Sequence, residues 1–188
     1  MITAGDFRKG TKFLYNGEPH VVVTYQHVKP GKGGAFMRTK MRNMITGSIY
    51  EETFRTEEKF EVPDLKYRDM QYLYQDGEEY HFMDQEDYDQ VVLNKSHLEE
   101  VLDLLKEETI YSILYFQDKP IDVAAPLFME LKVIDSPPGV RGDTAQGSAN
   151  KSAILETGLR VQVPLFVEEG DCIKVDTRNK SYIERVKK

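Results

Sequence analysis

The sequence predicts a mostly β protein made of small barrels. Short runs rich in Val, Ile, Tyr and Phe recur along the 188 residues and are bounded by Gly, Asn, Asp and Pro, which is the pattern of short strands joined by turns. Only one stretch has a clear helical pattern, and charge falls into three blocks of different character. Many short strands with few helices indicate β-barrels rather than a parallel α/β sheet.

Strands are predicted where apolar residues alternate or cluster between turn signals. The clearest turn is Asn16-Gly17, because both positions tolerate positive φ and therefore suit a two-residue hairpin. Thr46-Gly47 and Asp76-Gly77 mark two further turns. The predicted strands cover residues 12–15, 19–25, 35–42, 48–54, 71–74, 79–83, 110–116, 130–134, 159–163, 172–175 and 181–183.

One helix is predicted over residues 96–105. Ser96 and Glu99 have the spacing of a capping box, in which each side chain bonds the backbone amide at the other's position. Four apolar residues then follow at helical spacing: Leu98, Val101, Leu102 and Leu105. Residues 84–90 are expected to form either a second short helix or a turn.

The charge profile divides the chain into three parts. Residues 1–63 hold 10 Lys/Arg and 7 Asp/Glu, residues 64–127 hold 5 and 16, and residues 128–188 hold 10 and 9. The net charges are therefore +3, −11 and +1, and residues 1–50 alone carry 8 basic and 2 acidic residues, a net +6. The overall charge of −7 hides a basic head that suits a polyanionic partner.

The composition excludes several classes of protein. The single cysteine, Cys172, rules out a disulfide framework within the chain and zinc sites built from thiolates. Its strand pattern predicts a buried structural thiol. No window approaches the ~20 apolar residues of a membrane helix, and the first residues lack the features of a signal peptide. We therefore expect a cytoplasmic protein without membrane contact.

Metal and enzyme chemistry find no support in the sequence. The four histidines do not have the spacing of a metal-binding motif, and the acidic run 84–89 lacks the Gly and terminal Glu of a calcium loop. No nucleophile motif or acid–base constellation is present. We expect no metal, no cofactor and no enzymatic activity.

The glycine-rich stretch 29–36 is the most informative motif. It lies between two predicted strands and places one long cation, Lys32, among flexible and rigid backbone positions: Lys29, Pro30, Gly31, Gly33 and Gly34. It can be an exposed turn with an incidental lysine, a cationic finger for a polyanionic site, or a lysine presented to a modifying enzyme. The strand behind it favours a nucleic-acid partner, because its period of two puts Arg38, Lys40 and Arg42 on one face.

A second loop, residues 136–147, separates two strands near the end of the chain. Its Gly, Arg and polar residues suit contacts to phosphate and sugar. An ordinary surface loop explains the same composition equally well, although loops of this length are often functional.

Three segments resemble the bacterial elongation factor P family, a relative of the hypusine-containing translation factor of archaea and eukaryotes. Residues 29–36 look like that family's modified-lysine loop, and residues 138–145 look like the loop of its third domain. The C-terminal run resembles its signature, including residues 161–167, Gly170-Asp171 and residues 174–178. The resemblance extends over the whole chain.

The resemblance implies a fold and a set of domains. The family has three small β-barrel domains in an L shape: an SH3-like (KOW-like) barrel followed by two OB-folds. In this chain they would cover residues 1–63, 64–127 and 128–188. The first domain is the basic one and bears the lysine loop, and the second is strongly acidic.

The resemblance also implies a function. A member binds the 70S ribosome between the P and E sites and relieves stalling at consecutive prolines by positioning peptidyl-tRNA. Lys32 would be the modified residue that contacts the CCA end, supported by Lys29, Pro30, Gly31, Gly33 and Gly34. The third-domain loop would face the small subunit and the E-site mRNA codon through Arg141, Gly142, Asp143 and Thr144.

The implied partners are the ribosome, peptidyl-tRNA, mRNA at the E site and a lysine-modifying enzyme, with the protein acting as a monomer. Members that receive β-lysine commonly have Gln at the position of Gly34. The glycine in this chain leaves three states of Lys32 open: β-lysylation, another adduct or no modification.

The alternative function is a general single-stranded nucleic-acid-binding OB protein that acts away from the ribosome. Such proteins stack bases on exposed aromatic residues. The second domain offers six candidates for such a platform: Tyr67, Tyr72, Tyr74, Tyr80, Phe82 and Tyr88. Its net charge of −11 should repel a bare strand, which favours the ribosomal function.

Overall fold

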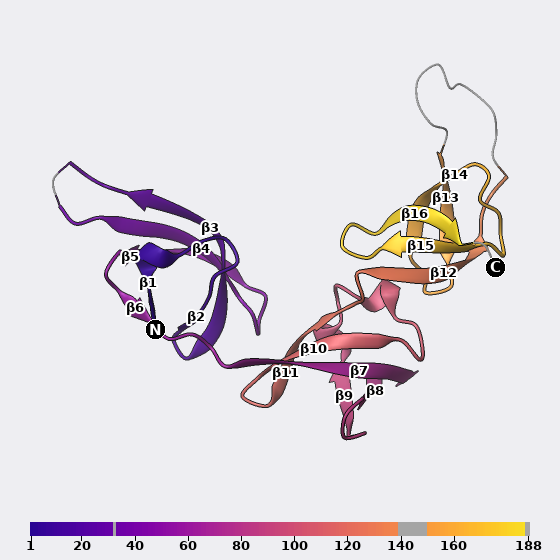
Figure 1. Ribbon diagram of the computed structural model, residues 1–188, viewed down its shortest axis with the longest axis horizontal. Helices are drawn as coiled ribbons and strands as arrows, with labels where there is room; N and C mark the ends of the chain where they lie inside the picture. Colours follow the sequence, from indigo (N-terminus) through magenta and orange to yellow (C-terminus); the bar gives the residue numbers. More distant parts are fainter. Residues whose placement is uncertain (32, 139–149, 187–188) are drawn as a thin grey trace, which may run out of the picture. The chain divides into compact units, whose positions relative to one another are not determined.

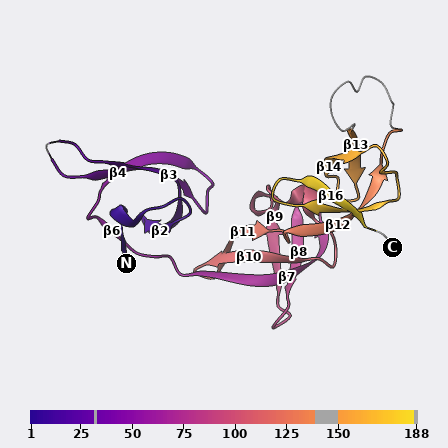
Figure 2. The ribbon, with the colours of Figure 1, turned by 45° about the horizontal axis from the view of Figure 1, so that its top comes forward.

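The computed structural model describes residues 1–31, 33–138 and 150–186, and most of them lie in β-strands (Figures 1 and 2). The prediction of a mostly β fold with barrel-like sheets is confirmed. The described chain divides into two compact units. The first holds residues 1–67 and 114–122, and the second holds residues 68–113 and 123–188.

The first barrel is built around a sheet of four sequential antiparallel strands. The predicted turn at its start is confirmed, because Asn16 has a φ of 53° and Gly17 a φ of 82°. Leu14 N donates to Glu61 O at 2.8 Å and links the sheet to a two-stranded ribbon. The elements are β2 (Lys12–Tyr15), β3 (Glu18–Val28), β4 (Phe36–Asn43) and β5 (Ile49–Arg55), with β1 (Ile2–Thr3), the 3₁₀ helix η1 (Ala4–Asp6) and β6 (Lys59–Phe60).

The core of the first barrel is a cluster of four phenylalanines from four different segments. Phe7 follows η1, Phe13 lies on β2, Phe54 on β5 and Phe60 on β6. Every pair of these rings lies within 4.5–6.3 Å between centroids, mostly tilted or edge to face. Large side chains therefore fill the centre of a barrel whose strands are short.

A five-stranded sheet follows, in the order β11-β10-β7-β8-β9. The six aromatic residues considered for the alternative function divide into two groups: Tyr72, Tyr80 and Phe82 are buried, whereas Tyr67, Tyr74 and Tyr88 are exposed. Half of the aromatic platform considered for the alternative function is therefore core. The strands are β7 (Leu65–Asp76), β8 (Glu79–Asp84), β9 (Gln90–Asn94), β10 (Ile110–Phe116) and β11 (Lys119–Ala124).

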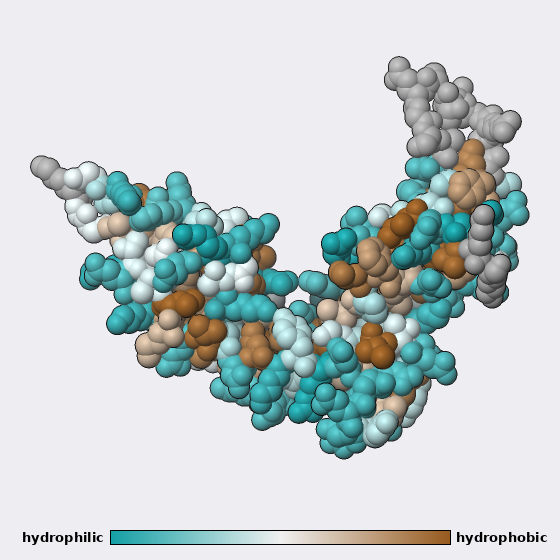
Figure 3. Space-filling view, in the orientation of Figure 1, coloured by the Kyte–Doolittle hydropathy of each residue, from teal (hydrophilic) through white to brown (hydrophobic). Residues whose placement is uncertain are grey.

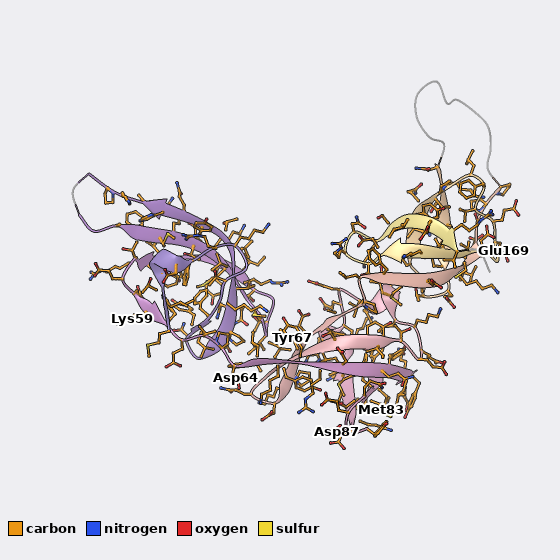
Figure 4. All side chains as sticks on the ribbon, viewed as in Figure 1. Lys59, Asp64, Tyr67, Met83, Asp87 and Glu169 are labelled. Carbon is orange, nitrogen blue, oxygen red and sulfur yellow. The ribbon has the colours of Figure 1, made fainter. Side chains whose placement is uncertain are left out.

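A side-chain hydrogen bond holds the start of β7. Tyr67, near the start of β7 and close to Asp64 in Figure 4, accepts a hydrogen bond from Lys12 Nζ at 2.8 Å.

Residues 84–90 form a turn rather than a helix. Asp84 N donates to Asp89 O at 2.9 Å and Asp84 Oδ1 accepts from Glu86 N at 2.8 Å, so the acidic residues of the turn, including Asp87 in Figure 4, are tied to backbone amides.

The predicted helix over residues 96–105 is wrong. The segment contains two 3₁₀ helices, η2 (Lys95–His97) and η3 (Leu102–Leu104). Its backbone amides at Leu98, Val101 and Leu104 bond carbonyls three residues back at 2.8–3.0 Å. The side chains of these three residues are buried, and they lie three positions apart. A 3₁₀ helix has three residues per turn, so it places all three on the same buried side.

The last barrel is a five-stranded antiparallel sheet in the order β14-β13-β12-β15-β16, and its edge strands β14 and β16 lie against each other. Its core is aliphatic and includes Leu131, Val133, Leu155, Val163 and Ile173. The strands are β12 (Phe128–Asp135), β13 (Asn150–Leu155), β14 (Arg160–Pro164), β15 (Cys172–Asp176) and β16 (Ser181–Val186).

The single cysteine was predicted to be buried, but its side chain is only half-buried. Cys172 is half-buried because it lies on the side of β15 opposite to Ile173 and Val175, whose side chains are completely buried. The alternation of the strand therefore places the thiol on its outer side together with Lys174.

Residues 102–106 are anchored to both parts of the second unit. Leu104 is buried in the core of the last barrel. Its carbonyl accepts a hydrogen bond from Tyr111 Oη at 2.7 Å, and the same Oη accepts one from Lys106 N at 2.9 Å. Lys106 Nζ also donates to Glu130 O and pairs with Glu156, both at 3.0 Å. This segment therefore joins β10 and β12 through directed polar contacts.

Candidate nucleic-acid interface

The hairpin of β3 and β4 projects from the first barrel and carries the glycine-rich loop (Figures 1 and 2). The pairing of β2 with β3 runs from Glu18 only to Val21, whereas β4 pairs with β3 as far as Val28 and with β5 as far as Phe36. A bulge in β3 lies between Val22 and Thr24. Among the described residues, the outer part of β3 is therefore an edge without a strand on its other side.

The described glycines of the loop differ in what they do. Gly33 has a φ of +115°, a conformation that L side chains rarely adopt, and an added Cβ would lie 3.9 Å from Pro30 Cγ. Gly31 and Gly34 have ordinary φ values, and nothing lies within 4 Å of an added Cβ. The turn itself requires only Gly33, so the other two glycines leave bare backbone on the exposed surface.

Lys32, the predicted modified residue, lies outside the described residues. Its neighbours Lys29 and Pro30 are exposed. The third-domain loop is likewise outside the described residues, with Arg141, Gly142, Asp143 and Thr144. Only the first three residues of this loop, 136–138, are described, and Ser136 Oγ donates to Val167 O at 3.2 Å.

The predicted basic face of β4 is present as a surface. Met37, Thr39 and Met41 are buried, while Arg38 and Lys40 are exposed and Arg42 is half-buried on the opposite side. The register adds an acidic residue that the sequence pattern did not reveal: Glu51 on β5 lies opposite Lys40 and its carboxylate is 3.6 Å from Arg38 Nε. Glu51 therefore offsets part of the positive charge that Arg38 and Lys40 give this face.

A hollow of about 510 Å³ lies at the base of the loop. It is lined by the start of β4 and the end of β5, from Gly34 to Phe36 and from Thr53 to Glu57. Two lining residues are linked by hydrogen bonds: Thr56 N and Oγ1 both donate to Ala35 O, at 3.3 and 3.2 Å. The end of the loop at Ala35 is therefore fixed to β5's side of the barrel, next to the hollow.

A buried polar network supports the other end of the hairpin. His20 is 1% exposed, and its ring nitrogens contact Glu18 O and Tyr50 Oη. Burial raises the pKa of the Tyr50 hydroxyl, so it stays protonated and can donate or accept. Asn43 Oδ1 accepts from the amides of Ile45 and Thr46, which shapes the turn into β5.

The structure adds two residues near the base of the hairpin that the sequence pattern did not single out. The Arg8 guanidinium lies over the ring of Tyr25, with 5.5 Å between Cζ and the ring centroid. Both side chains are exposed. Tyr25 was visible only as one residue of a strand, and Arg8 comes from the loop after η1.

The described part of the chain holds no cluster of three or more His, Cys, Asp or Glu side chains placed to bind a metal ion. Among the described residues, no helix has the length and apolar character needed to span a membrane. On the face shown in Figure 3, hydrophobic residues form only small, separate patches among hydrophilic ones.

Comparison with known proteins decides the family. Three sequence models of elongation factor P match: its KOW-like domain over residues 3–60, its OB domain over residues 65–123 and its C-terminal domain over residues 129–185. Elongation factor P of Clostridioides difficile is 51% identical over 186 residues, covering 99% of this chain and 100% of the relative. The chain belongs to the elongation factor P family. A second relative, elongation factor P of Desulfosudis oleivorans, is 49% identical over 188 residues, which cover both chains completely.

A solved structure shows a similar fold over part of this chain. The solved structure of eukaryotic translation initiation factor 5A from Methanococcus jannaschii matches with a TM-score of 0.55 and 24% identity, over 65% of this chain and 94% of that chain. At this identity the likeness shows a common fold. Membership in the elongation factor P family makes this chain a translation elongation factor.

Proposed function

We propose that this elongation factor P binds the 70S ribosome between the P and E sites and relieves stalling at consecutive prolines by positioning peptidyl-tRNA. The single observation that supports this most is the projecting hairpin of β3 and β4. It presents an exposed loop with bare glycine backbone, next to a face with three cations. A long, cationic and narrow projection suits a polyanionic cleft better than a flat protein surface.

The physical task at a proline codon is orientation. Proline's ring fixes φ and constrains the geometry of its nitrogen, which makes it a slow partner in peptide transfer. A cationic side chain that lies along the CCA end would hold the peptidyl-tRNA in a reactive pose. Such orientation can contribute roughly 7–11 kcal/mol in the most favourable intramolecular cases. The protein would then assist the ribosome's own chemistry without being an enzyme.

The cationic group in this proposal is Lys32. Lys29 and Pro30 are exposed between the end of β3 and Lys32, and Gly33 follows with a positive φ. Gly34 has open space around it, so its small size admits a modifying enzyme or the RNA equally well. The third-domain loop with Arg141, Gly142, Asp143 and Thr144 would contact the small subunit and the mRNA at the E site.

The modification of Lys32 can be measured directly. Intact-protein mass spectrometry from the native host, followed by fragmentation of the Lys32 peptide, would give the mass of an adduct. A β-lysyl group, a different adduct and an unmodified lysine predict three different masses. The first two would establish a lysine-modifying enzyme as a partner.

The function is tested by Lys32→Ala in cells that lack the native protein. We expect loss of polyproline reporter synthesis, while a reporter without consecutive prolines is made normally. Lys59→Ala is the matched control, because Lys59 is an exposed lysine on β6 of the same barrel (Figure 4). Normal polyproline synthesis by Lys32→Ala would contradict the proposal.

A further inference from the structure

The Arg8–Tyr25 pair is a cation–aromatic contact on an open part of the first barrel. Tyr25 is 41% exposed although its cross-strand partner Thr39 is completely buried. The two side chains lie on the same face, because directly opposite residues of antiparallel strands do. The face of the sheet that is buried at Thr39 is therefore exposed to solvent at Tyr25, which places an aromatic ring on the surface.

The pair is fixed in position before any partner binds. Arg8 Nη1 donates to Phe7 O at 2.7 Å and lies 3.4 Å from Gly5 O, while Arg8 N donates to Thr11 Oγ1 at 3.0 Å. Thr11 N returns a bond to Arg8 O at 3.0 Å. A guanidinium held by two backbone carbonyls loses little freedom on binding, which favours affinity.

The electrostatic surroundings favour an anionic partner. Lys9 is exposed next to Arg8, and residues 1–50 carry a net +6. The acidic group nearest in sequence is Asp6, whose carboxylate accepts hydrogen bonds from Thr3 N and Thr3 Oγ1. These bonds, with the charge of Arg8, lower the pKa of Asp6, so its charge is engaged within the loop.

The ring lies on the strand that leads to the lysine loop. Tyr25 is four residues before Lys29, which in a strand of ~3.3 Å per residue corresponds to about 13 Å. No other strand pairs with this part of β3 on its outer side among the described residues. A single-stranded RNA segment that reaches the loop can therefore also reach the ring.

We propose that Arg8 and Tyr25 form a stacking platform for an unpaired base of the RNA that the hairpin approaches. An aromatic ring accepts any base through its π face, and the guanidinium can stack and pair with a phosphate at once. The inference rests on the proposed function, because peptidyl-tRNA provides the unpaired RNA. It assigns a second point of RNA contact, separate from Lys32.

The test compares variants that keep or remove the ring. Purified Tyr25→Leu keeps bulk without a π system, and Tyr25→Phe keeps the ring without the hydroxyl. Binding is measured to 70S ribosomes stalled with peptidyl-tRNA at consecutive prolines. We expect about tenfold weaker binding for Tyr25→Leu, as the loss of one stacked base predicts, and less than twofold change for Tyr25→Phe. Tyr88→Leu, a tyrosine that is 69% exposed in the middle sheet's turn, should bind normally.

Two results would overturn the platform. The first is normal binding by Tyr25→Leu, and the second is equal weakening by Tyr25→Leu and Tyr25→Phe, which would assign the effect to the hydroxyl. A benzophenone amino acid at position 25 gives an independent readout: crosslinks to RNA support the platform, and crosslinks to protein alone overturn it.

The Lys32→Ala variant separates the two proposals. If Lys32→Ala loses polyproline rescue while Tyr25→Leu binds normally, the platform is wrong and the proposed function stands. If Lys32→Ala keeps full rescue, the proposed function fails, whatever Tyr25→Leu shows.

Discussion

The first and last barrels are of similar size but fill their centres differently. The first uses four phenylalanine rings and two methionines, Met37 and Met41, gathered from many short segments. The last uses mainly Val, Leu and Ile, with two or three buried residues from each of β12, β13, β14 and β15. In the first barrel the four rings from separate segments all contact one another. In the last barrel the core is divided among a larger number of aliphatic side chains.

The difference teaches how a small barrel can present a long hairpin. β3 runs beyond its pairing with β2, and none of its residues after Val22 is buried, so the outer half of this strand adds little to the core. A few large rings compensate, since each buries far more apolar surface than one Val or Ala does. The first barrel should therefore be sensitive to single core substitutions and tolerant of changes along the outer half of β3.

The largest effect is expected from Phe13→Ala. Its ring lies 4.5, 5.2 and 6.3 Å from those of Phe7, Phe60 and Phe54, so its removal leaves a cavity among all three. We expect a loss of about 3–5 kcal/mol in the free energy of unfolding, against about 0.5–1.5 kcal/mol for Ile173→Val in the last barrel. Hydrogen exchange resolved by peptide would locate the loss in β2–β5. Equal costs for the two variants would contradict the comparison.

A smaller effect is expected from Tyr111→Phe in the second unit. The variant removes the hydroxyl that bonds Leu104 O and Lys106 N and leaves both groups without that partner. We expect a loss of about 1–3 kcal/mol in the free energy of unfolding at neutral pH, measured by chemical denaturation. Tyr182→Phe, a half-buried tyrosine of the last barrel, serves as the control.

The same variant has a signature in alkaline solution. Burial raises the pKa of Tyr111 from 10.0 to about 12, so the folded state holds the proton more tightly than the unfolded state. Its contribution to stability is complete below pH 10 and is lost as pH rises towards 12. Tyr111→Phe should therefore lose less stability than the parent protein over this range. Parallel declines would contradict the assigned role of burial.

The smallest effect on stability is expected from Glu51→Gln on the hairpin face. The Arg38–Glu51 pair is exposed on both sides, so its loss should change the free energy of unfolding by less than about 1 kcal/mol. Binding to ribosomes should instead tighten a few-fold and depend more steeply on salt, because one carboxylate is removed from a cationic face.

The matched control for Glu51→Gln is Glu184→Gln, which breaks the similar exposed pair of Lys174 and Glu184 in the last barrel. We expect no change in ribosome binding from it. If both variants tighten binding equally, net charge alone acts and the β4 face has no special role.

Most strands were predictable because alternation is enforced by neighbours. β4 and β5 alternate clearly, and Asn16-Gly17 takes the positive φ values that its residue types permit. Five strands were missed: β1, β6, β9, β11 and β13. β1 and β6 are two residues long, and β9, β11 and β13 begin with polar residues. β9 and β13 are held by pairing with β8, β12 and β14. Tertiary pairing can override a weak local pattern.

The segment over residues 96–105 failed for a related reason. Its apolar residues fit a spacing of either three or 3.6, and burial of Leu98, Val101 and Leu104 selected the first. Ser96 and Glu99 matched a cap motif by spacing, but the structure has a 3₁₀ helix there, Lys95–His97. Local sequence cannot choose between helices when the deciding contacts lie in another part of the fold.

The candidate site was predictable only in part. A period of two was enough to place Arg38 and Lys40 on one exposed face. Glu51 and the Arg8–Tyr25 pair could not be placed, because strand register and the fold of the loop after η1 bring these residues together. Such contacts between distant segments leave no signal in a single sequence.

The most direct test of the account measures peptide transfer itself. With purified ribosomes stalled before a second proline, we predict that the protein accelerates single-turnover transfer, that Lys32→Ala loses this acceleration, and that Lys59→Ala retains it. Ribosome binding measured in parallel shows whether Lys32→Ala still occupies its site. Bound Lys32→Ala that accelerates transfer as well as the parent protein would contradict the central claim that the hairpin's lysine orients the peptidyl-tRNA.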